Sequence, residues 1–314
     1  MFREQIKVID CTVRDGGLIN NHHFTDEFVR AVYKSLSEAG VDYMELGYRS
    51  SRKLFSPEEY GAWKYCDDEK IREITAGIES KMKLTIMVDA HRVEEQEFSP
   101  VDESPIDMIR VATYVKDIDK AIALANKCHD LGYETAVNIM SISKEIEPDI
   151  IEALEQLAKT HVDVVYVVDS FGALYCEQIE YLVKLYAKYL PGKEIGVHCH
   201  NNQQLAYSNT IEGIIHNANY VDASLFGIGR GPGNCCLELI LGFLKNPKFD
   251  LVPIFQVIQD YMLPMREEIE WGYLIPYFIT GILNEHPRSA IAWRESEKKD
   301  KYVEFYQEMT EQLG

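Results

Sequence analysis

Basic residues are scarce in this sequence of 314 residues. Lys and Arg together number 32 against 51 Asp and Glu, which gives a formal net charge of −19 at pH 7. A surface this acidic repels nucleic acid and anionic membranes, so neither is expected as a partner. Long hydrophobic runs are also missing: no stretch approaches the roughly 20 apolar residues that a membrane span needs, and the opening MFREQIKVID has no apolar signal-peptide core. We therefore expect a cytoplasmic protein.

Cysteines in a paired or metal-binding spacing are absent too. The seven cysteines are odd in number, and none of them forms a CxxC motif. Cys11, Cys128 and Cys176 lie inside apolar stretches, which is typical of buried free thiols in a reducing compartment. Core packing is the favoured interpretation for the adjacent Cys235 and Cys236.

Hydrophobic residues are plentiful at 46%, and they are arranged in a regular order. Short apolar runs rich in β-branched residues alternate with longer helical patterns as far as about residue 245. Near-continuous apolar strands separated by helices are typical of a parallel sheet covered by helices. The eight predicted strands are Ile6–Val13, Val41–Gly47, Leu84–Asp89, Met108–Ala112, Thr135–Met140, Val162–Asp169, Glu194–His200 and Tyr220–Phe226.

Eight strand–helix units in this length indicate a closed α/β barrel, the TIM (β/α)8 fold, rather than an open sheet. The third unit is the weakest, because Pro100–Pro105 leaves little room for a helix after its strand. Beyond about residue 251 the alternation stops, and Val252–Ile269 and Asp300–Gln312 have helical patterns. We predict a catalytic barrel over residues 1–245 and a C-terminal helical extension over residues 246–314.

Polar residues at the predicted strand ends mark the site. In such barrels the functional side chains stand at the carboxyl ends of the strands. Arg14 and Asp15 end the first run and Glu45 ends the second, while His198 and His200 stand two apart on the seventh. Strand alternation points both imidazoles to one face, the barrel interior. Two histidines alone could be satisfied by core hydrogen bonds, but charged groups converging from other strands would be costly without a cation.

One carboxylate and two imidazoles suit a divalent ion with positions left for water and substrate. We therefore predict a metal site made by Asp15, His198 and His200. Mn²⁺ or Mg²⁺ is the expected ion. Co²⁺ and Zn²⁺ stay as alternatives, because one carboxylate and two imidazoles do not discriminate among these four ions.

A glycine-rich loop, FGIGRGPGN, follows the eighth run. It could cradle phosphate through its backbone N–H groups, but it matches neither the P-loop nor the dinucleotide-binding motif. We interpret it as a mobile lid that carries Asn234, with a plain tight turn as the alternative.

The motifs CTVRDGG, MELGY, VVDSFGAL, VHCHNN and GIGRGPGNCCLE, in this order over residues 6–245, resemble the DRE-TIM metallolyase superfamily. That superfamily includes hydroxymethylglutaryl-CoA lyase, isopropylmalate and homocitrate synthases, and 4-hydroxy-2-oxovalerate aldolase. VVDSFGAL and GNCCLE are most similar to the aldolase branch. The resemblance implies a lyase that forms or cleaves a 4-hydroxy-2-oxoacid from pyruvate and an aldehyde through a metal-stabilised enolate.

The resemblance also implies roles for individual residues. Asp15, His198 and His200 match the metal ligands, and Arg14 matches the arginine that stabilises the enolate oxygen. Glu45 matches an acid near the metal-bound water. Ser170 matches a substrate-contacting serine, and Asn234 matches the loop asparagine that reaches toward the metal.

Two departures concern proton transfer. The aldolases carry their base histidine three residues after the metal-ligand aspartate, where this chain has Leu18. His22 or His23 could take this role from a shifted loop, and we name His23 as the candidate base, against the alternative that it only stabilises the loop or faces solvent. The synthases carry a glutamine after the RDG motif, and its absence here argues against an acetyl-CoA condensing enzyme.

Three functions stay open from the sequence. The leading one is the aldolase. The second is an acyl-CoA lyase or condensing enzyme, with Arg230 on the CoA phosphates, and the third is a non-catalytic metal-binding barrel. The resemblance implies an aldehyde dehydrogenase as partner. The C-terminal aromatic segment could close over the barrel with Tyr273 or Tyr277, or instead pack under the barrel or form a homodimer interface. Arg49, after the second strand, is a candidate specificity residue.

Overall fold

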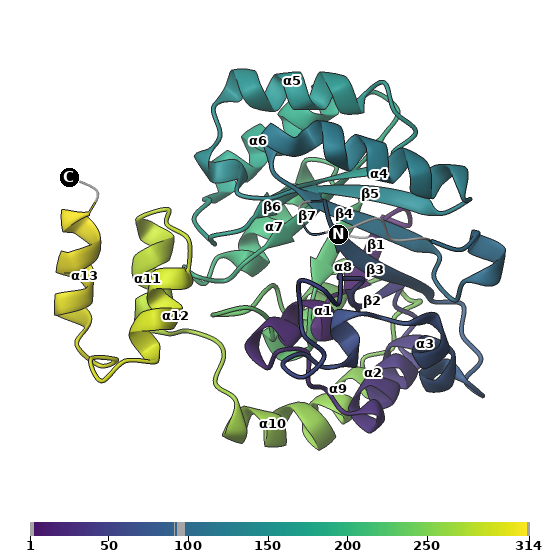
Figure 1. Ribbon diagram of the computed structural model, residues 1–314, viewed down its shortest axis with the longest axis horizontal. Helices are drawn as coiled ribbons and strands as arrows, with labels where there is room; N and C mark the ends of the chain where they lie inside the picture. The colour runs from purple at the N-terminus through teal and green to yellow at the C-terminus, as the bar shows by residue number, and fades with distance from the viewer. Residues whose placement is uncertain (1–2, 91, 93–97, 313–314) are drawn as a thin grey trace.

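Eight parallel strands form a closed barrel in chain order (Figure 1), which confirms the predicted TIM barrel. The computed structural model describes residues 3–90, 92 and 98–312. The first and last strands close the barrel through pairs that run from Lys7 with Tyr220 to Asp10 with Ala223. The strands are β1 Lys7–Asp10, β2 Tyr43–Tyr48, β3 Lys83–Asp89, β4 Met108–Thr113, β5 Glu134–Ile139, β6 Val164–Asp169, β7 Glu194–Cys199 and β8 Tyr220–Ala223.

Amphipathic helices cover the outside of the barrel. Helix α2, for example, begins after Thr25, whose hydroxyl accepts a hydrogen bond from the Phe28 N–H, and buries Val29, Val32 and Leu36. Between β3 and β4 the described residues contain only the 3-10 turn Val101–Glu103, as the prolines predicted. The outer helices are α2 Asp26–Glu38, α3 Asp68–Thr75, α4 Ile118–Asp130, α5 Glu147–Leu157, α6 Cys176–Tyr189, α7 Ala206–Ile215 and α8 Leu237–Leu244.

The first predicted strand was too long, because the chain turns at Asp10. The Asp10 carboxylate accepts hydrogen bonds from the Thr12 N–H at 3.1 Å and the Thr12 hydroxyl at 2.6 Å, which ends the strand and starts a turn. Residues Thr12–Gly16 then form the short helix α1. Arg14 and Asp15 therefore reach the barrel mouth from a helix rather than from the strand itself.

The last predicted strand was also too long. Strand β8 ends at Ala223, and Phe226 has a φ of +54°, a left-handed conformation that a strand cannot contain. The 3-10 turn Leu225–Gly227 takes its place and leads into the glycine-rich loop.

The predicted C-terminal extension has two parts. In the first, α9 Val252–Val257, a π-helical turn Ile258–Met262 and α10 Leu263–Glu268 form one helical stretch, and Ile254, Val257, Met262 and Trp271 belong to the main core of the barrel. In the second, the helices stand beside the barrel (Figure 1) around a small core of their own that includes Trp293, Phe305 and Met309. These helices are α11 Ile275–Ile282, α12 Arg288–Arg294 and α13 Tyr302–Glu311.

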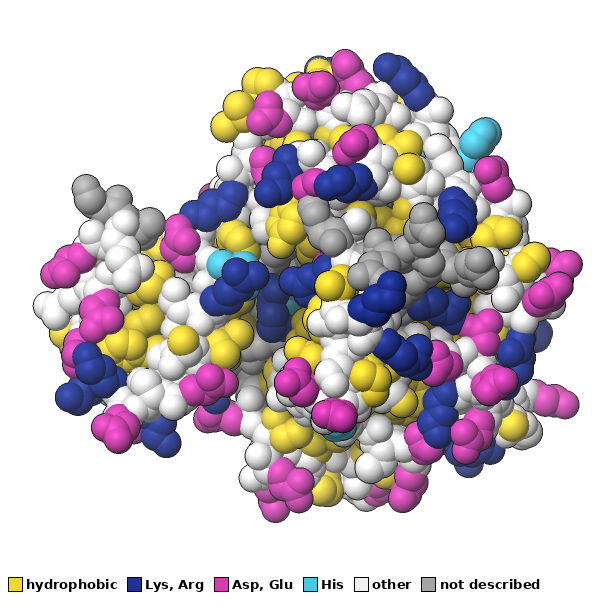
Figure 2. All heavy atoms as spheres, in the orientation of Figure 1, with side chains coloured by type: hydrophobic (Ala, Val, Ile, Leu, Met, Phe, Trp, Pro, Cys, Tyr) yellow, Lys and Arg dark blue, Asp and Glu magenta, His cyan; other side chains and the backbone are white. Residues whose placement is uncertain are grey.

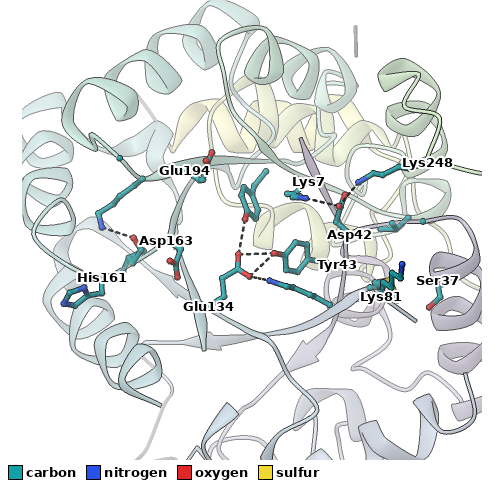
Figure 3. A pocket seen from close by; sticks show the side chains of 18 of the residues that line it. Lys7, Ser37, Asp42, Tyr43, Lys81, Glu134, His161, Asp163, Glu194 and Lys248 are labelled. Carbon is teal, nitrogen blue, oxygen red and sulfur yellow. Dashed lines mark hydrogen bonds and ion pairs between the residues drawn. The ribbon is translucent and has the colours of Figure 1, made fainter. Parts of the chain in front are cut away.

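The amino ends of the strands surround a hollow of about 850 Å³, here called the basal hollow (Figure 3). Glu134 lies within it and accepts hydrogen bonds from the hydroxyls of Tyr43 at 2.9 Å and Tyr220 at 3.0 Å and from the Lys83 ammonium at 2.8 Å. Asp42 pairs with Lys248 at 2.6 Å. Glu134 and Asp42 are thus paired with lysines of the same hollow, as expected for the end of a barrel that serves stability.

All seven cysteines are free thiols, which the sequence predicted for Cys11, Cys128 and Cys176. Cys11, Cys128 and Cys235 are buried, whereas Cys176 and Cys236 are only partly so. Within the described residues, no helix is both long and apolar enough to cross a lipid bilayer.

Candidate metal centre

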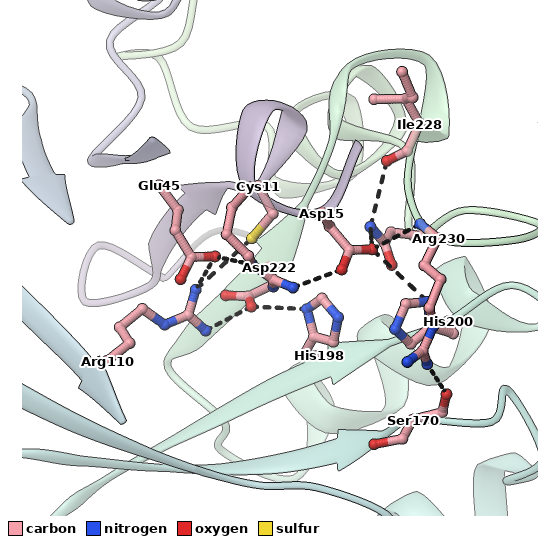
Figure 4. Close-up of polar contacts among 12 residues, drawn as sticks. Cys11, Asp15, Glu45, Arg110, Ser170, His198, His200, Asp222, Ile228 and Arg230 are labelled. Carbon is pink, nitrogen blue, oxygen red and sulfur yellow. Dashed lines mark hydrogen bonds and ion pairs between the residues drawn. The ribbon is translucent and has the colours of Figure 1, made fainter. Parts of the chain in front are cut away.

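Asp15, His198 and His200 meet at the mouth of the barrel (Figure 4). Each is buried, and one potential ligand atom from each lies within 4.8 Å of those of the other two. His198 is on β7 and His200 directly follows it, so strand alternation turns both imidazoles inward, with ring centroids 5.0 Å apart. The structure therefore brings together the three residues that the sequence singled out.

His198 is oriented by Asp222, which the sequence analysis missed. The His198 Nδ1 lies 2.8 Å from the Asp222 carboxylate, so that Nδ1–H donates and Nε2 keeps its lone pair. Asp222 also accepts a hydrogen bond at 2.6 Å from Arg110, a fully buried residue of β4. Burial alone would raise the pKa of Asp222, but Arg110 and His198 lower it to about 2. Arg110 and Asp222 could have been noticed in the sequence, because each is a single charged residue inside an apolar strand.

Asp15 is surrounded by donors. Its carboxylate accepts hydrogen bonds from the Arg14 guanidinium at 2.5 Å, the Asn234 amide at 2.7 Å and the Arg230 N–H at 3.2 Å. Burial by itself would raise the pKa of Asp15, but the positive groups around it, Arg14 first, hold that pKa well below its usual value. The carboxylate is therefore ionised, as a metal ligand must be.

Two buried polar atoms next to this carboxylate have no hydrogen-bond partner among the described residues. They are Nδ1 of His200, which lies 3.9 Å from an Asp15 oxygen, and Oδ1 of Asn234. An unpaired buried acceptor is costly. Burial holds the pKa of His200 well below its ordinary value, so the imidazole is neutral and can offer a lone pair. This arrangement of ionised carboxylate, oriented imidazole and unpaired acceptors fits a divalent cation.

Arg14 and Glu45 form a buried charge cluster beside these ligands. Glu45 accepts a hydrogen bond from the Arg14 Nε at 2.7 Å and also pairs with Arg110 at 2.9 Å. Burial opposes the charge of Arg14, but the carboxylates of Glu45 and Asp15 outweigh it and raise the pKa of Arg14 well above its ordinary value. Arg14 is thus a permanent cation held rigidly at the barrel mouth.

The two neighbouring histidines separate into different environments, and the candidate base His23 lies away from the site. His23 is exposed, and its Nε2 contacts the Glu59 carbonyl oxygen at 3.0 Å. His22 points inward: it is buried, and its ring lies edge-on to Tyr48 with centroids 5.5 Å apart. A Cβ at Gly17 would lie 2.1 Å from the His22 Nδ1, so glycine makes room for this ring. The reason for the difference is the backbone turn at His22, where φ is +63°.

His22 has an unusual environment for an imidazole. Neither ring nitrogen has a hydrogen-bond partner among the described residues. Burial, with a further contribution from the charge of Lys64, lowers the pKa of His22 to about 3. The ring is therefore neutral, and one of its two unpaired nitrogens keeps a lone pair.

The glycine-rich loop folds back over the metal centre. A Cβ at Gly233 would lie 1.8 Å from the Gly227 carbonyl oxygen, so only glycine fits there. The backbone N–H of Arg230 donates a hydrogen bond to the Asp15 carboxylate, and its guanidinium donates one to the Ser170 carbonyl oxygen at 2.5 Å. The Ser170 hydroxyl accepts a hydrogen bond from the Ser141 N–H at 2.8 Å. In this conformation the Arg230 N–H is hydrogen-bonded to the Asp15 carboxylate, so it is not free to bind a phosphate group.

Two further candidates have different positions. Tyr277 on α11 is buried and borders a cavity at the barrel mouth, whereas Tyr273 is 53% exposed. Arg49 turns away from the mouth: it pairs with Asp68 and donates to the Cys66 carbonyl oxygen at 2.9 Å. The position of Arg49 therefore does not support a role in substrate specificity.

The chain belongs to the HMGL-like family, whose model matches residues 5–256, and this confirms the resemblance found in the sequence. It is 30% identical to a 4-hydroxy-2-oxovalerate aldolase from Thermus thermophilus, over 85% of this chain and 80% of that protein. It is also 28% identical to an oxaloacetate decarboxylase from Mycobacterium tuberculosis, over 92% of this chain and 87% of that protein.

Solved structures agree on the fold. The N-terminal domain of a candidate aldolase from Bacteroides vulgatus is 29% identical, with a TM-score of 0.79 over 95% of this chain and all of that one. The carboxyl transferase domain of Rhizobium etli pyruvate carboxylase has a TM-score of 0.73 over 96% of this chain and 55% of that one. At 15% identity, this second likeness concerns the fold alone.

Proposed function

We propose that this protein is a metal-dependent carbon–carbon lyase that cleaves a 4-hydroxy-2-oxoacid to pyruvate and an aldehyde, or runs the reverse reaction. The observation that carries the proposal is the convergence of Asp15, His198 and His200 beside the buried cation Arg14. Relatives named 4-hydroxy-2-oxovalerate aldolase at about 30% identity support it.

Asp15, His198 and His200 would hold the divalent ion, with Mn²⁺ or Mg²⁺ expected and Co²⁺ or Zn²⁺ as alternatives. When bound, such an ion supplies Lewis-acid polarisation of a 2-oxoacid carbonyl. Asn234 would contact the ion or the substrate through its amide oxygen, which is unpaired beside Asp15.

Arg14 would stabilise the enolate oxygen. Cleaving the bond next to a carbonyl leaves an enolate, whose negative charge needs a positive group already in place. Arg14 is such a group, because Glu45 and Asp15 hold its guanidinium and keep it charged. In this proposal Glu45 fixes the orientation of Arg14, and Ser170 contacts the substrate from the end of β6.

His22 is the histidine that we now propose for proton transfer. In the cleavage direction a base must take the proton of the 4-hydroxyl group, and a neutral imidazole with free nitrogens can do so. His22 has both properties, while its neighbour His23 faces solvent. In this proposal Leu18 cannot act as the base at the position where the aldolases have a histidine, and His22 supplies an imidazole from the next turn of the chain, packed against Gly17.

A direct test is proton exchange at the methyl group of pyruvate. The metal-loaded protein is incubated with pyruvate in D₂O, and deuterium incorporation is followed by mass spectrometry. We expect exchange that requires the metal and that falls about 10²–10³-fold in Arg14→Lys, since a single ammonium replaces the bidentate guanidinium. Absence of exchange with Mn²⁺, Mg²⁺, Co²⁺ and Zn²⁺ alike would refute the proposal.

Oxaloacetate decarboxylation is a second candidate, and Leu18 favours it. Loss of CO₂ from oxaloacetate produces the same pyruvate enolate but needs no base to remove a hydroxyl proton. A relative named oxaloacetate decarboxylase aligns over 92% of this chain. Pyruvate release from oxaloacetate that survives His22→Asn, together with failure to cleave any 4-hydroxy-2-oxoacid, would favour this reaction over the aldolase.

The remaining expectations concern the cell and its partners. We propose a cytoplasmic enzyme that acts on small molecules, forms a homodimer and passes its aldehyde to a dehydrogenase. In the acyl-CoA alternative, the Arg230 guanidinium would have to break its hydrogen bond with the Ser170 carbonyl oxygen and bind the CoA phosphates instead. Mass photometry tests the dimer, and a thermal-shift measurement with acetyl-CoA tests the alternative.

A further inference from the structure

A second hollow of about 850 Å³, here called the mouth cavity, lies between the glycine-rich loop, the residues after α1 and the C-terminal helices. One wall comes from Leu18 and Asn20 after α1, another from Arg230 in the glycine-rich loop, and a third from Tyr277 and Arg294 on the C-terminal helices. Arg230 links the cavity to the metal centre, because its backbone N–H donates to Asp15. Figure 2 shows Lys and Arg side chains gathered at a hollow between the C-terminal helices and the barrel.

The wall groups are sorted by depth. Glu268, Glu270 and Glu295 are exposed, which places carboxylates at the outer rim of the cavity. Arg230, Arg294 and Asn20 are partly buried and lie further in. A bound molecule therefore passes acidic groups first and then meets guanidinium and amide groups.

The inner groups keep unused hydrogen-bonding capacity. The Asn20 Oδ1 is buried without a hydrogen-bond partner among the described residues. Arg230 bonds the Ser170 carbonyl oxygen, but no carboxylate of the described residues pairs with its guanidinium within 4 Å. Arg294 donates to the Tyr277 hydroxyl at 3.1 Å and pairs with Glu270 at 2.5 Å, which fixes its guanidinium at the wall. An unpaired acceptor and two guanidinium groups thus belong to residues that line the same cavity.

We propose that the mouth cavity binds the aldehyde half of the substrate, and that this half is an uncharged chain with several hydroxyl groups. The inference rests on the proposed aldolase function. A hydroxyl group can donate to Asn20 and accept from Arg230 or Arg294 at once. A short alkyl aldehyde would fill little of the cavity and leave Asn20 unpaired. An anionic aldehyde would have to pass Glu268 and Glu295 at the rim, on a chain of net charge −19.

The reaction balances without another reactant. In cleavage, the bond between C3 and C4 of the 4-hydroxy-2-oxoacid breaks, and its electron pair stays on C3 as the pyruvate enolate. The 4-hydroxyl proton passes to the base, C4 becomes the aldehyde carbon, and C3 takes up one proton from water while the base returns its own to water. The hydroxyl groups on the carbons beyond C4 stay unchanged in the aldehyde that the mouth cavity holds.

The test compares aldehydes of equal chain length in aldol addition to pyruvate. Glyceraldehyde is set against propionaldehyde, erythrose against butyraldehyde, and glyceraldehyde 3-phosphate against glyceraldehyde. We expect kcat/KM to favour the hydroxylated member of each neutral pair at least about tenfold, because a site built to bond a hydroxyl rejects the analogue without it. We also expect the phosphorylated aldehyde to be the poorer of its pair.

Two variants connect the preference to the walls. Asn20→Leu replaces the unpaired acceptor with an alkyl group, and Arg294→Ala removes a donor; each should lower the preference for hydroxylated aldehydes about tenfold. Arg288→Ala is the matched control, because Arg288 is an exposed arginine of the same helix that does not line the cavity. It should leave the preference as in the wild type.

The outcomes separate the two proposals. Pyruvate proton exchange without any aldehyde tests the aldolase function alone. If exchange occurs while alkyl or phosphorylated aldehydes react better than glyceraldehyde and erythrose, the polyhydroxylated substrate is refuted and the aldolase stands. A preference for hydroxylated aldehydes that both Asn20→Leu and Arg294→Ala retain would place their binding elsewhere and refute the role of the mouth cavity. Absence of exchange with all four metals overturns both proposals.

Discussion

The two ends of the barrel hold hollows of about 850 Å³ each, and the polar groups around them differ in how they are paired. In the basal hollow, Glu134 accepts three hydrogen bonds and Asp42 pairs with Lys248. At the mouth, His200, Asn234 and His22 keep buried polar atoms without partners among the described residues. Equal volume therefore says little about function, whereas the unpaired buried groups beside Asp15 indicate a binding role for the mouth.

The largest expected effect at the mouth comes from Asp15→Asn. The substitution removes the only carboxylate among the three proposed ligands while keeping the size of the side chain. We expect pyruvate proton exchange to fall by about 10³-fold or more. Exchange that stays near the wild-type rate in a folded Asp15→Asn protein, as judged by its unfolding transition, would break the assignment of the mouth as the metal-binding end.

His22→Asn should have the next largest effect. It removes the proposed base but keeps a polar side chain, and we expect cleavage of a 4-hydroxy-2-oxoacid to slow by about 10²-fold, within the range of a lost general base. His23→Asn is the matched control one residue away, and it should leave the rate unchanged because His23 faces solvent. Equal rates in the two variants would remove His22 from the mechanism.

Glu134→Gln tests the role of the basal hollow in stability. The amide cannot accept from Tyr43, Tyr220 and Lys83 as the carboxylate does, so the free energy of unfolding should fall by about 1–3 kcal/mol. The specific rate of pyruvate exchange should not change. A loss of activity without a loss of stability in chemical denaturation would contradict the division of roles between the two ends.

Lys64→Met has the smallest expected effect, and it should stabilise the protein rather than destabilise it. Lys64 is 4% exposed, its ammonium lies 4.1 Å from the Phe55 ring centroid and 4.5 Å from that of Tyr48, and no carboxylate of the described residues pairs with it within 4 Å. Burial lowers the pKa of Lys64 to about 8. At neutral pH both the folded and unfolded states carry the charge, so methionine should raise the free energy of unfolding by about 1 kcal/mol.

The pH dependence of this variant follows from the lowered pKa of Lys64. Between about pH 8 and pH 10.5 the unfolded chain keeps the Lys64 proton that the folded protein loses, so this group adds stability to the wild type as pH rises. The advantage of Lys64→Met should therefore shrink over this range. Urea denaturation at pH 7 and pH 9.5 measures it, and an advantage that grows with pH would contradict the lowered pKa.

Much of the site could be predicted from the sequence because it lies where a regular pattern ends. His198 and His200 follow the period of a strand, so their common direction could be predicted. His22 and His23 could not be distinguished, because Asn21 and His22 have left-handed φ values of +50° and +63° and neither strand nor helix periodicity applies there.

The supporting charges were missed for a different reason. Arg110 and Asp222 lie within apolar strands, and their roles depend on contacts across the barrel, between β4 and β8, that no local pattern contains. The walls of the mouth cavity are equally remote from one another in the sequence, since Asn20 and Arg294 line one cavity only because the C-terminal helices pack beside the barrel.

Binding of Mn²⁺ to the protein stripped of metal tests the central claim most directly, followed by the loss of the free-ion signal in electron paramagnetic resonance. The account predicts one bound ion per chain in the wild type, the same in Glu134→Gln, and loss of this site in His200→Ala. Failure of the wild type to bind Mn²⁺, or unchanged binding in His200→Ala, would contradict a metal centre formed by Asp15, His198 and His200.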